Sequence, residues 1–174
     1  MREPIITDRL RLRPFTFDDL DEVHTMWADP EVGRWVGGTH ELLRDSIDEL
    51  EGHMRHQVRH GYAFWAVEES ASGRVVGEVG LQLLEGRGPE VEIGWCLARE
   101  TWGSGYATEA ARAWLAAGFA LLGLPRILAV VLPENGASRR VCEKLGMAEK
   151  GMREADGAPH VQYVIERSAP RAGA

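Results

Sequence analysis

Three consecutive β-strand patterns in the middle of the chain constrain its fold more than any other feature. The patterns cover residues 62–67, 74–83 and 90–97. Only short turns separate them, around Ser72-Gly73 and over 86–89. Strands joined by such short turns pair antiparallel, because a parallel pair needs a crossover of a dozen or more residues. We therefore expect a sheet built around an antiparallel meander.

Helical patterns flank this meander and supply crossovers. Helices are predicted over 17–28, about 40–60, about 105–122 and 135–145. Further strands are predicted over 10–15, 126–132, 147–152 and 160–166. This order predicts an α/β (α+β) fold with a mixed, mostly antiparallel central sheet of about seven strands and helices on both faces.

The predicted helix at 40–60 carries two stripes of side chains at helical spacing. An apolar stripe, expected to face the core, consists of Leu43, Ile47, Leu50, Met54 and Val58. A second stripe consists of Glu49, His53, His56 and His60. Its spacing would permit a metal ion. We expect instead an exposed face rich in histidine, and no metal.

Length and charge exclude several classes of protein. The chain has 174 residues and a formal net charge of −7. That length suits one domain, expected over 1–168, with a flexible tail at 169–174. The acidic balance argues against a nucleic-acid partner, because phosphate binding needs clustered Lys and Arg. The longest uncharged apolar stretch, 113–125, is too short to cross a bilayer, so no membrane partner is expected.

The cysteine pattern and the N-terminal residues bear on the cellular compartment. The two cysteines, Cys96 and Cys142, are far apart and form no CxxC motif. This pattern excludes a zinc ribbon and a disulfide scaffold, and it suits a reducing cytosol. The N-terminal residues have no secretory-signal pattern. We expect a cytoplasmic monomer or homodimer.

A glycine-rich segment with the sequence WGSGYATEA, at 102–110, lies between a predicted strand and a predicted helix. Its glycines let the backbone approach a ligand closely, and the peptide N–H groups of a helix N-terminus favour phosphate. It is neither a Walker loop nor a dinucleotide-binding fingerprint. By itself it is equally consistent with a plain tight turn.

Several ordered motifs together resemble one superfamily. They are EIGWCL at 92–97, the glycine-rich segment, PENGAS at 133–138 and KLGM at 144–147. This series resembles the GNAT superfamily of acetyl-CoA-dependent N-acetyltransferases, over about residues 5–166. The opening TDRLRLR at 7–13 and DPEV at 29–32 resemble the branch that contains the ribosomal-protein N-terminal (alanine) acetyltransferases.

The resemblance implies acetyl-CoA as cofactor and a pyrophosphate loop at Trp102, Gly103, Ser104, Gly105, Tyr106 and Ala107. Trp102 stands where the family usually has Gln or Arg, which removes one polar contact. The resemblance also implies a splay between the fourth and fifth strands. Free backbone around Cys96 and Leu97 would pair there with the pantetheine arm and polarise the thioester carbonyl.

The predicted helix at 135–145 would supply further contacts to the cofactor. The resemblance places Asn135 and Ser138 against it, and Cys142 follows on the same helix face. Cys142 is alternatively a small buried core thiol. Ser138 could donate a proton to the departing thiolate, or the thiolate could leave unassisted, because a thiol is a fair leaving group.

Amine acetylation needs a base, because an alkyl amine is mostly protonated at pH 7. Glu92 is the first candidate, since it lies on the strand that leads to the splay. Glu90 and Glu78 are the reserves. Glu92 could alternatively be a solvated strand residue or part of a structural ion pair.

The first two predicted helices are expected to form the wall of the acceptor site. Residues 16–51 contain eleven acidic residues and two arginines, a local net charge of −9. Such a rim attracts a cationic amine, unless it is only a solvated helix face. Trp27 and Trp35, with Glu92, are the candidate substrate-binding residues, although either tryptophan could equally pack in the core.

These features together predict an N-acetyltransferase. It would transfer acetyl from acetyl-CoA to a primary amine by direct attack in a ternary complex. The acceptor could be a protein N-terminal α-amine or a small cationic amine such as an antibiotic or a polyamine. A non-catalytic acyl-CoA-binding module is the alternative from another class.

Overall fold

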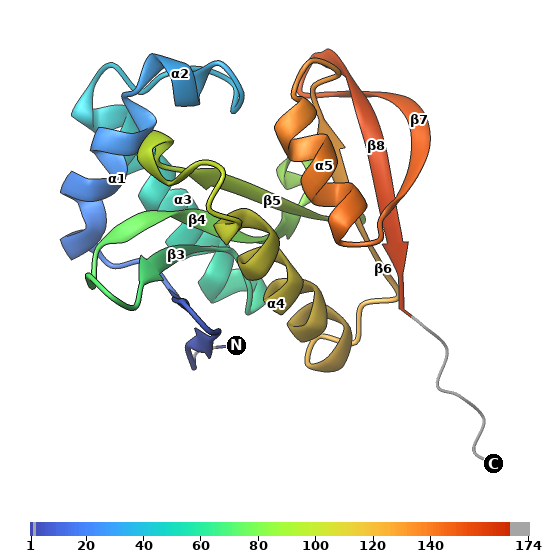
Figure 1. Ribbon diagram of the computed structural model, residues 1–174, viewed down its shortest axis with the longest axis horizontal. Coiled ribbons are helices and arrows are strands. Elements are labelled where there is room, and N and C mark those ends of the chain that lie inside the picture. The colour runs from blue at the N-terminus through green and yellow to red at the C-terminus, as the bar shows by residue number, and fades with distance from the viewer. Residues whose placement is uncertain (2, 168–174) are drawn as a thin grey trace.

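The strands form a single sheet with the order β1-β2-β3-β4-β5-β6-β8-β7 (Figure 1). The computed structural model describes residue 1 and residues 3–167, and the predicted tail at 169–174 lies outside them. Within this part of the chain the strands are β1 (Ile5–Ile6), β2 (Leu10–Arg13), β3 (Phe64–Glu69), β4 (Val75–Leu83), β5 (Val91–Leu97), β6 (Arg126–Val131), β7 (Ala148–Ala155) and β8 (Ala158–Glu166).

The predicted meander is confirmed, because β3, β4 and β5 pair antiparallel in succession. The predicted splay is confirmed as well. Strands β5 and β6 are parallel and share one register pair, Glu92 with Leu128. Strand β6 then pairs antiparallel with β8, and β8 with β7. The sheet therefore consists of two antiparallel halves that meet at a single point.

The helices cover both faces of the sheet. They are α1 (Leu20–Trp27), α2 (Pro30–Gly33), α3 (Leu43–His60), α4 (Tyr106–Ala120) and α5 (Gly136–Lys144), with short 3-10 turns at Phe17–Asp19, Leu84–Gly86 and Arg99–Thr101. In Figure 1, α4 and α5 lie in front of the sheet and α3 lies behind it. None of the helices in the described part of the chain is long and apolar enough to span a membrane.

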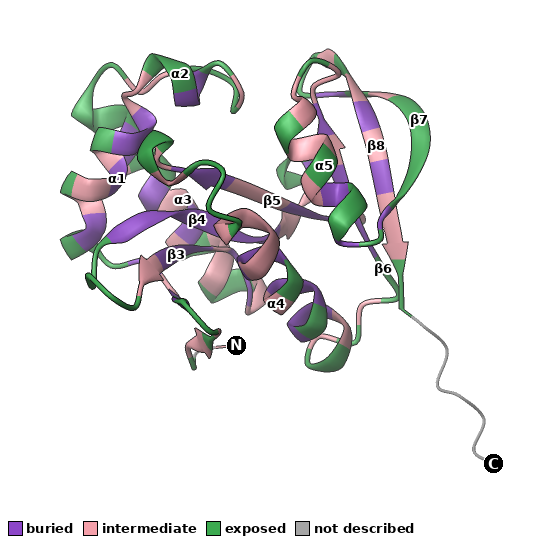
Figure 2. Cartoon of the chain, viewed as in Figure 1, coloured by how far each residue is buried: buried purple, intermediate pink, exposed green. Residues whose placement is uncertain are grey.

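Strand alternation sorts the core into two layers. Odd-numbered residues of β3, of β5 and of β4 beyond its irregular start face α4, where the Trp65 and Trp114 rings meet edge to face at 4.8 Å. Even-numbered residues, such as Ala66 and Cys96, face α1 and α3. The central strands are consequently buried on both sides, whereas β7 forms an exposed edge (Figure 2).

The connection after α1 contains a helix that the sequence pattern did not predict. The Asp29-Pro30 pair ends α1 as expected, but Pro30 also begins the four-residue α2. Proline is favoured in the first turn of a helix, and the Asp29 side chain accepts a hydrogen bond from the Glu31 N–H at 2.8 Å. The two-residue strand β1 was also not predicted.

The predicted apolar stripe of α3 is confirmed at Leu50 and wrong at both of its ends. Leu43 and Val58 are 46 % and 88 % exposed. The buried residues are Ser46, Leu50 and His53. The side chain of Ser46 is buried because its hydroxyl has hydrogen-bond partners on other segments, the Nδ1 atoms of two histidines. Helix α3 thus turns a partly polar face inward.

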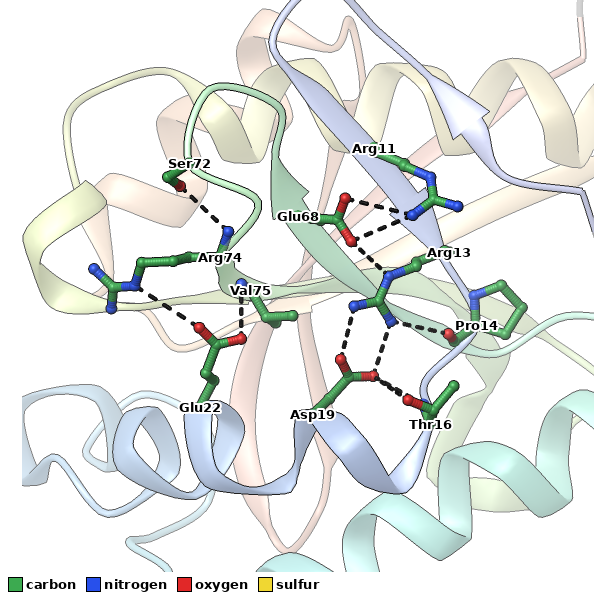
Figure 3. Close-up of polar contacts among 10 residues, drawn as sticks. All are labelled: Arg11, Arg13, Pro14, Thr16, Asp19, Glu22, Glu68, Ser72, Arg74 and Val75. Atoms are coloured by element: carbon green, nitrogen blue, oxygen red, sulfur yellow. Dashed lines mark hydrogen bonds and ion pairs between the residues drawn. The ribbon is translucent and has the colours of Figure 1, made fainter.

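An arginine joins the start of α1 to the sheet (Figure 3). The Arg13 guanidinium, on β2, contacts both carboxylate oxygens of Asp19 at 2.7 and 2.9 Å and one oxygen of Glu68 on β3 at 2.7 Å. Asp19 also accepts from the Thr16 N–H, which completes a capping box. Burial opposes ionisation of Asp19, but Arg13 and Thr16 outweigh it and hold the pKa of this carboxyl below its usual value.

We expect Asp19→Asn to lower the free energy of unfolding by about 3 kcal/mol at pH 7, because Arg13 loses a largely buried partner. The lowered pKa means that Asp19 stabilises the fold fully above its unfolded-state pKa near 3.8 and loses this effect as the pH falls through the native value. The difference between wild type and variant should therefore be constant above about pH 5 and shrink as the pH falls below the unfolded-state value near 3.8 in urea titrations. The exposed neighbour in Asp18→Asn is the control, and an equal effect there would contradict this assignment.

Candidate active site

A cavity of about 910 Å³ lies where β5 and β6 diverge. Its wall combines β4, β5 and β6 with the turn before α4, the start of α5 and the loop after α2. Eleven of the predicted site residues line it: Trp35, Glu92, Cys96, Leu97, Trp102, Gly103, Gly105, Tyr106, Ala107, Asn135 and Ser138. Trp27, Ser104 and Cys142 are not part of the wall.

The splay leaves part of the β5 backbone facing the cavity. The Ala98 N–H donates to the Val76 carbonyl on β4, so by alternation the backbone groups of Cys96 also face β4. Those of Trp95 and Leu97 then face β6. Past the single bridge at Glu92, β6 is too distant to pair with them. The free edge is therefore that of Trp95 and Leu97, and Cys96 contributes its side chain instead.

Trp102 has a contact that the sequence did not suggest. Its indole N–H donates to the Leu97 carbonyl at 2.8 Å. Trp102, which departs from the family pattern, thus occupies one hydrogen-bond acceptor on the free edge of β5. The Leu97 N–H and both backbone groups of Trp95 remain for a ligand.

The turn before α4 presents peptide N–H groups to the cavity. Gly103 and Gly105 have φ values of +80° and +88°, which favour glycine. Helix α4 begins at Tyr106, so the N–H groups of Tyr106, Ala107 and Thr108 have no partner within the helix. No acceptor for them occurs among the described residues. Their orientation and the helix dipole favour a phosphate group.

Helix α5 places a hydroxyl beside the free edge of β5. Asn135 caps the helix by accepting from the Ser138 N–H at 3.0 Å. The Ser138 hydroxyl accepts from the Trp95 indole N–H at 3.2 Å, which leaves its own hydrogen to donate. Cys142 is fully buried in the core, and burial raises the pKa of its thiol to about 12. The expectation that Cys142 contacts the cofactor therefore has no support in its position.

Glu92 has the properties of a general base. Its side chain lines the cavity and is only 8 % exposed. Burial raises the pKa of Glu92 to about 7, although the Gln82 amide donates to it at 2.6 Å and opposes this shift. A base with a pKa near the working pH is the most efficient one. By contrast, Glu90 is held in ion pairs with Arg153 and Arg126 outside the cavity wall.

A second carboxylate, that of Glu78 on β4, also lines the cavity, on the face of the sheet that α3 covers. Glu78 accepts from the Trp27 indole N–H at 3.2 Å and lies 3.0 Å from His53 Nε2. The expected exposed face of histidines is wrong at His53, which is 6 % exposed among the rings of Phe15, Trp27 and Phe64. Burial lowers the pKa of His53, but the charge of Glu78 outweighs it and the pKa lies above its usual value.

The other histidines of this stripe behave differently. His56 and His60 contact each other with ring centroids 4.4 Å apart. Burial and the neighbouring positive charges lower the pKa of His56 to about 4. The described residues contain no group of three or more His, Cys, Asp or Glu arranged to hold a metal ion.

The two candidate tryptophans have different positions. Trp35, half-buried, lines the cavity, and the Arg34 guanidinium covers its ring at 4.5 Å. Trp27 is 3 % exposed in the core and reaches the cavity only through Glu78. Sequence reasoning also missed several cavity residues, namely Gln82, Arg140, Lys144, Asp156 and His160. The i, i+4 spacing of Arg140 and Lys144 on the predicted helix was the one available signal.

Comparison with known proteins decides the family. Residues 9–148 match the family described as acetyltransferase (GNAT) domain. The chain belongs to the GNAT family. It is therefore an acetyl-CoA-dependent N-acetyltransferase.

Relatives of this GNAT chain cover almost its whole length. The protein YkkB of Bacillus subtilis is 34 % identical over 82 % of this chain and 84 % of its own. The uncharacterised N-acetyltransferase YoaA of the same species is 30 % identical over 96 % and 92 %. An acetyltransferase structure from Agrobacterium tumefaciens is similar with a TM-score of 0.84 and 26 % identity, covering 96 % of both chains.

Two more distant structures share the fold alone. One is a protein from Vibrio cholerae proposed to be a ribosomal-protein-serine acetyltransferase, with a TM-score of 0.79, 19 % identity and coverage of 96 % and 100 %. The other is the aminoglycoside acetyltransferase AAC(6')-Ib in complex with coenzyme A, with a TM-score of 0.76, 20 % identity and coverage of 90 % and 94 %.

The raised pKa of Glu92 predicts that this residue destabilises the GNAT fold at high pH. A native pKa of about 7, above the unfolded value near 4.5, means that ionising Glu92 costs stability as the pH rises between these values. We expect Glu92→Gln to increase the free energy of unfolding, by roughly 2 to 3 kcal/mol more at pH 8 than at pH 5.

Glu90→Gln is the matched control for this measurement. The hydrogen bond and charge of Arg153 lower the pKa of Glu90, so this variant should lose stability at pH 8 instead of gaining it. Urea titrations of the three proteins at both pH values give the comparison. A Glu92→Gln variant that gains nothing at pH 8 would contradict the burial argument.

Proposed function

We propose that this N-acetyltransferase transfers acetyl from acetyl-CoA to a primary amine of a cationic acceptor by direct attack, with both substrates bound. The acceptor is a protein N-terminal α-amine or a small cationic amine. The observation that carries the proposal is the carboxylate of Glu92, which lies on the cavity wall with a pKa of about 7.

The residues present fit acetyl-CoA along one side of the cavity. The unpartnered N–H groups at 106–108, together with Gly103 and Gly105, suit the pyrophosphate. The backbone of Trp95 suits the amide groups of the pantetheine arm. Arg140 and Lys144, one turn apart on α5, add positive charge to the same wall. When bound, acetyl-CoA supplies an acetyl group activated as a thioester.

The opposite side of the cavity is acidic and suits a cationic acceptor. Glu78 and Glu92 line it on the face of the sheet that α3 covers, and Glu49 reaches it from α3 itself. Asp156, at the turn between β7 and β8, closes the wall beside Glu92. Acidic walls concentrate a cation at the site, which supports an amine with a positive charge. Trp35 adds an aromatic surface.

Proton handling falls to two residues on opposite sides of the splay. Glu92 accepts the proton of the acceptor ammonium, which produces the neutral amine that can attack. The Ser138 hydroxyl, held by the Trp95 indole, can donate its hydrogen to the departing sulfur. A peptide N–H on the free edge of β5 can donate to the carbonyl oxygen that becomes negative.

Neither the similar structures nor the N-terminal motif distinguishes a protein N-terminus from a small amine as the acceptor. The fold-level similarity to the Vibrio cholerae protein and to the aminoglycoside enzyme includes both kinds of acceptor. The motif at 7–13 favours the ribosomal-protein branch, but none of its residues lines the cavity. A panel of basic peptides, polyamines and aminoglycosides, scored by release of free thiol from acetyl-CoA, separates these acceptors.

We also propose the domain bounds and the cellular location. Residues 1–168 are proposed to form one domain, because a single core layer joins β2 to β8 through α4. A cytoplasmic location is proposed because Cys96 and Cys142 are both free, as expected in a reducing compartment.

We expect Glu92→Gln to lower kcat with the best amine at least a hundredfold at pH 7, because the ammonium loses its proton acceptor. In the wild type, kcat should rise with pH through about 7 as Glu92 ionises. Glu90→Gln, two residues away on the same chain, should keep both the rate and the pH profile. An unchanged rate in Glu92→Gln would remove Glu92 as the base.

Gly105→Val should raise the dissociation constant of CoA at least tenfold. Valine cannot keep a φ of +88° without strain, so the N–H groups that follow must move. Gly73→Val is the matched control, because Gly73 has a φ of +72° in the turn between β3 and β4, far from the cavity wall. Both variants should lose similar stability, but only Gly105→Val should lose affinity in calorimetry. Intact affinity would contradict the assignment of the loop.

A further inference from the structure

The N-terminal segment at 7–9 contacts the turn before α4 from the side that faces away from the cavity. Arg9 Nη1 donates to the Ser104 carbonyl at 2.9 Å, and Nε donates to the Glu109 carboxylate at 2.8 Å. The Arg9 guanidinium also lies over the Tyr106 ring, 4.6 Å from its centroid. Neither Arg9 nor Ser104 lines the cavity, whereas Gly105 and Tyr106 do. Arg9 thus supports Ser104 and the first turn of α4 from the side away from the cavity.

The contact with Ser104 fixes the direction of a peptide group. The Ser104 carbonyl and the Gly105 N–H belong to one planar trans peptide unit, so they point in opposite directions. Because Arg9 binds the carbonyl on the far side, the Gly105 N–H is directed toward the cavity. Gly105, on one side of this peptide, tolerates either sign of φ, so the peptide can rotate when nothing holds it. A rotated peptide would present its carbonyl oxygen to a phosphate and repel it.

Glu109 and Tyr106 extend the same support. One oxygen of the Glu109 carboxylate accepts from the Thr7 hydroxyl at 2.6 Å and from the Arg9 N–H at 2.9 Å. The Glu109 N–H binds the Gly105 carbonyl at 3.1 Å, which closes the first turn of α4. The Tyr106 hydroxyl donates to Glu69 at the end of β3 at 2.6 Å. Arg9 also compensates the negative charge of Glu109, which lies in the first turn of α4.

We propose that Arg9 is a positioning residue for cofactor binding: it orients the Ser104–Gly105 peptide so that the N–H groups before α4 point at the pyrophosphate. This inference rests on the proposed function of the turn at 102–107. It assigns a role to the motif at 7–13, which otherwise lies outside the site. The role depends on the fork of the guanidinium, which reaches a carbonyl and a carboxylate together, and not on charge alone.

The experiment compares CoA with pantetheine, which lacks the pyrophosphate and the nucleotide. Arg9→Lys keeps the charge but removes the fork, so we expect the dissociation constant of CoA to rise about tenfold in calorimetry. The dissociation constant of pantetheine, measured by NMR titration, should change less than twofold. Arg11→Lys is the control two positions further along, on β2, because among the described residues the Arg11 side chain bonds only to Glu68, at 3.4 Å, and it should leave both constants unchanged.

A second variant protects the test from a folding defect in Arg9→Lys. Glu109→Asp keeps the charge but shortens the anchor of Arg9, so it should weaken CoA binding in the same selective way. The double variant should be no weaker than the more affected single one, because both changes act on one unit. Circular dichroism and thermal melting establish that each protein is folded.

Each outcome decides the inference. A selective loss of CoA affinity supports it. Equal losses for CoA and pantetheine would show a general structural role and overturn it, and so would wild-type affinity for CoA in Arg9→Lys. A wild-type protein that binds pantetheine but gains nothing from the pyrophosphate would overturn the proposed function of the turn itself, and the inference with it.

Discussion

The divergence of two parallel strands is the constraint on which the rest of this structure depends. Strands β5 and β6 touch at Glu92 and Leu128 and then separate toward the end of β5. Because they are parallel, the chain must cross over between them, and α4 is that crossover. The N-terminus of α4 therefore comes to lie beside the unpaired backbone of β5. One topological fact thus places peptide donors, a free strand edge and a cavity in the same region.

Burial turns this cavity into a site for proton transfer. Strand alternation directs Glu78 and Glu92 toward α3, onto the face where β4 and β5 are covered. Glu92 is shielded from solvent, and its hydrogen-bond partner is a neutral amide that only partly offsets this, so its pKa rises to about 7. Glu78 has His53 and Trp27 as partners and is held in place. Two carboxylates on one face thus differ in role because their partners differ, a pattern common at catalytic sites.

The sequence predicted what depends on local pattern and failed where a distant partner decides. The meander and the turn before α4 follow from spacing and turn residues, and both occur. The inward face of α3 could not be read from hydropathy, because His53 is buried by its contact with Glu78, twenty-five positions later in the chain. Trp102 is a similar case. Its contact with the Leu97 carbonyl depends on the path of the turn and not on residue type.

The position of the N-terminal motif limits what its resemblance can say about the acceptor. Thr7 and Arg9 contact the first turn of α4, which is on the side proposed for the cofactor. The side of the cavity proposed for the acceptor is lined by residues of α2, α3 and the turn between β7 and β8. Among the described residues, no hydrogen bond or ion pair joins Thr7 or Arg9 to these segments. A family resemblance carried by residues 7–13 is therefore informative about how the cofactor is held. The acceptor must be inferred from Glu49, Glu78 and Trp35, whose charge and aromatic surface favour a cationic amine.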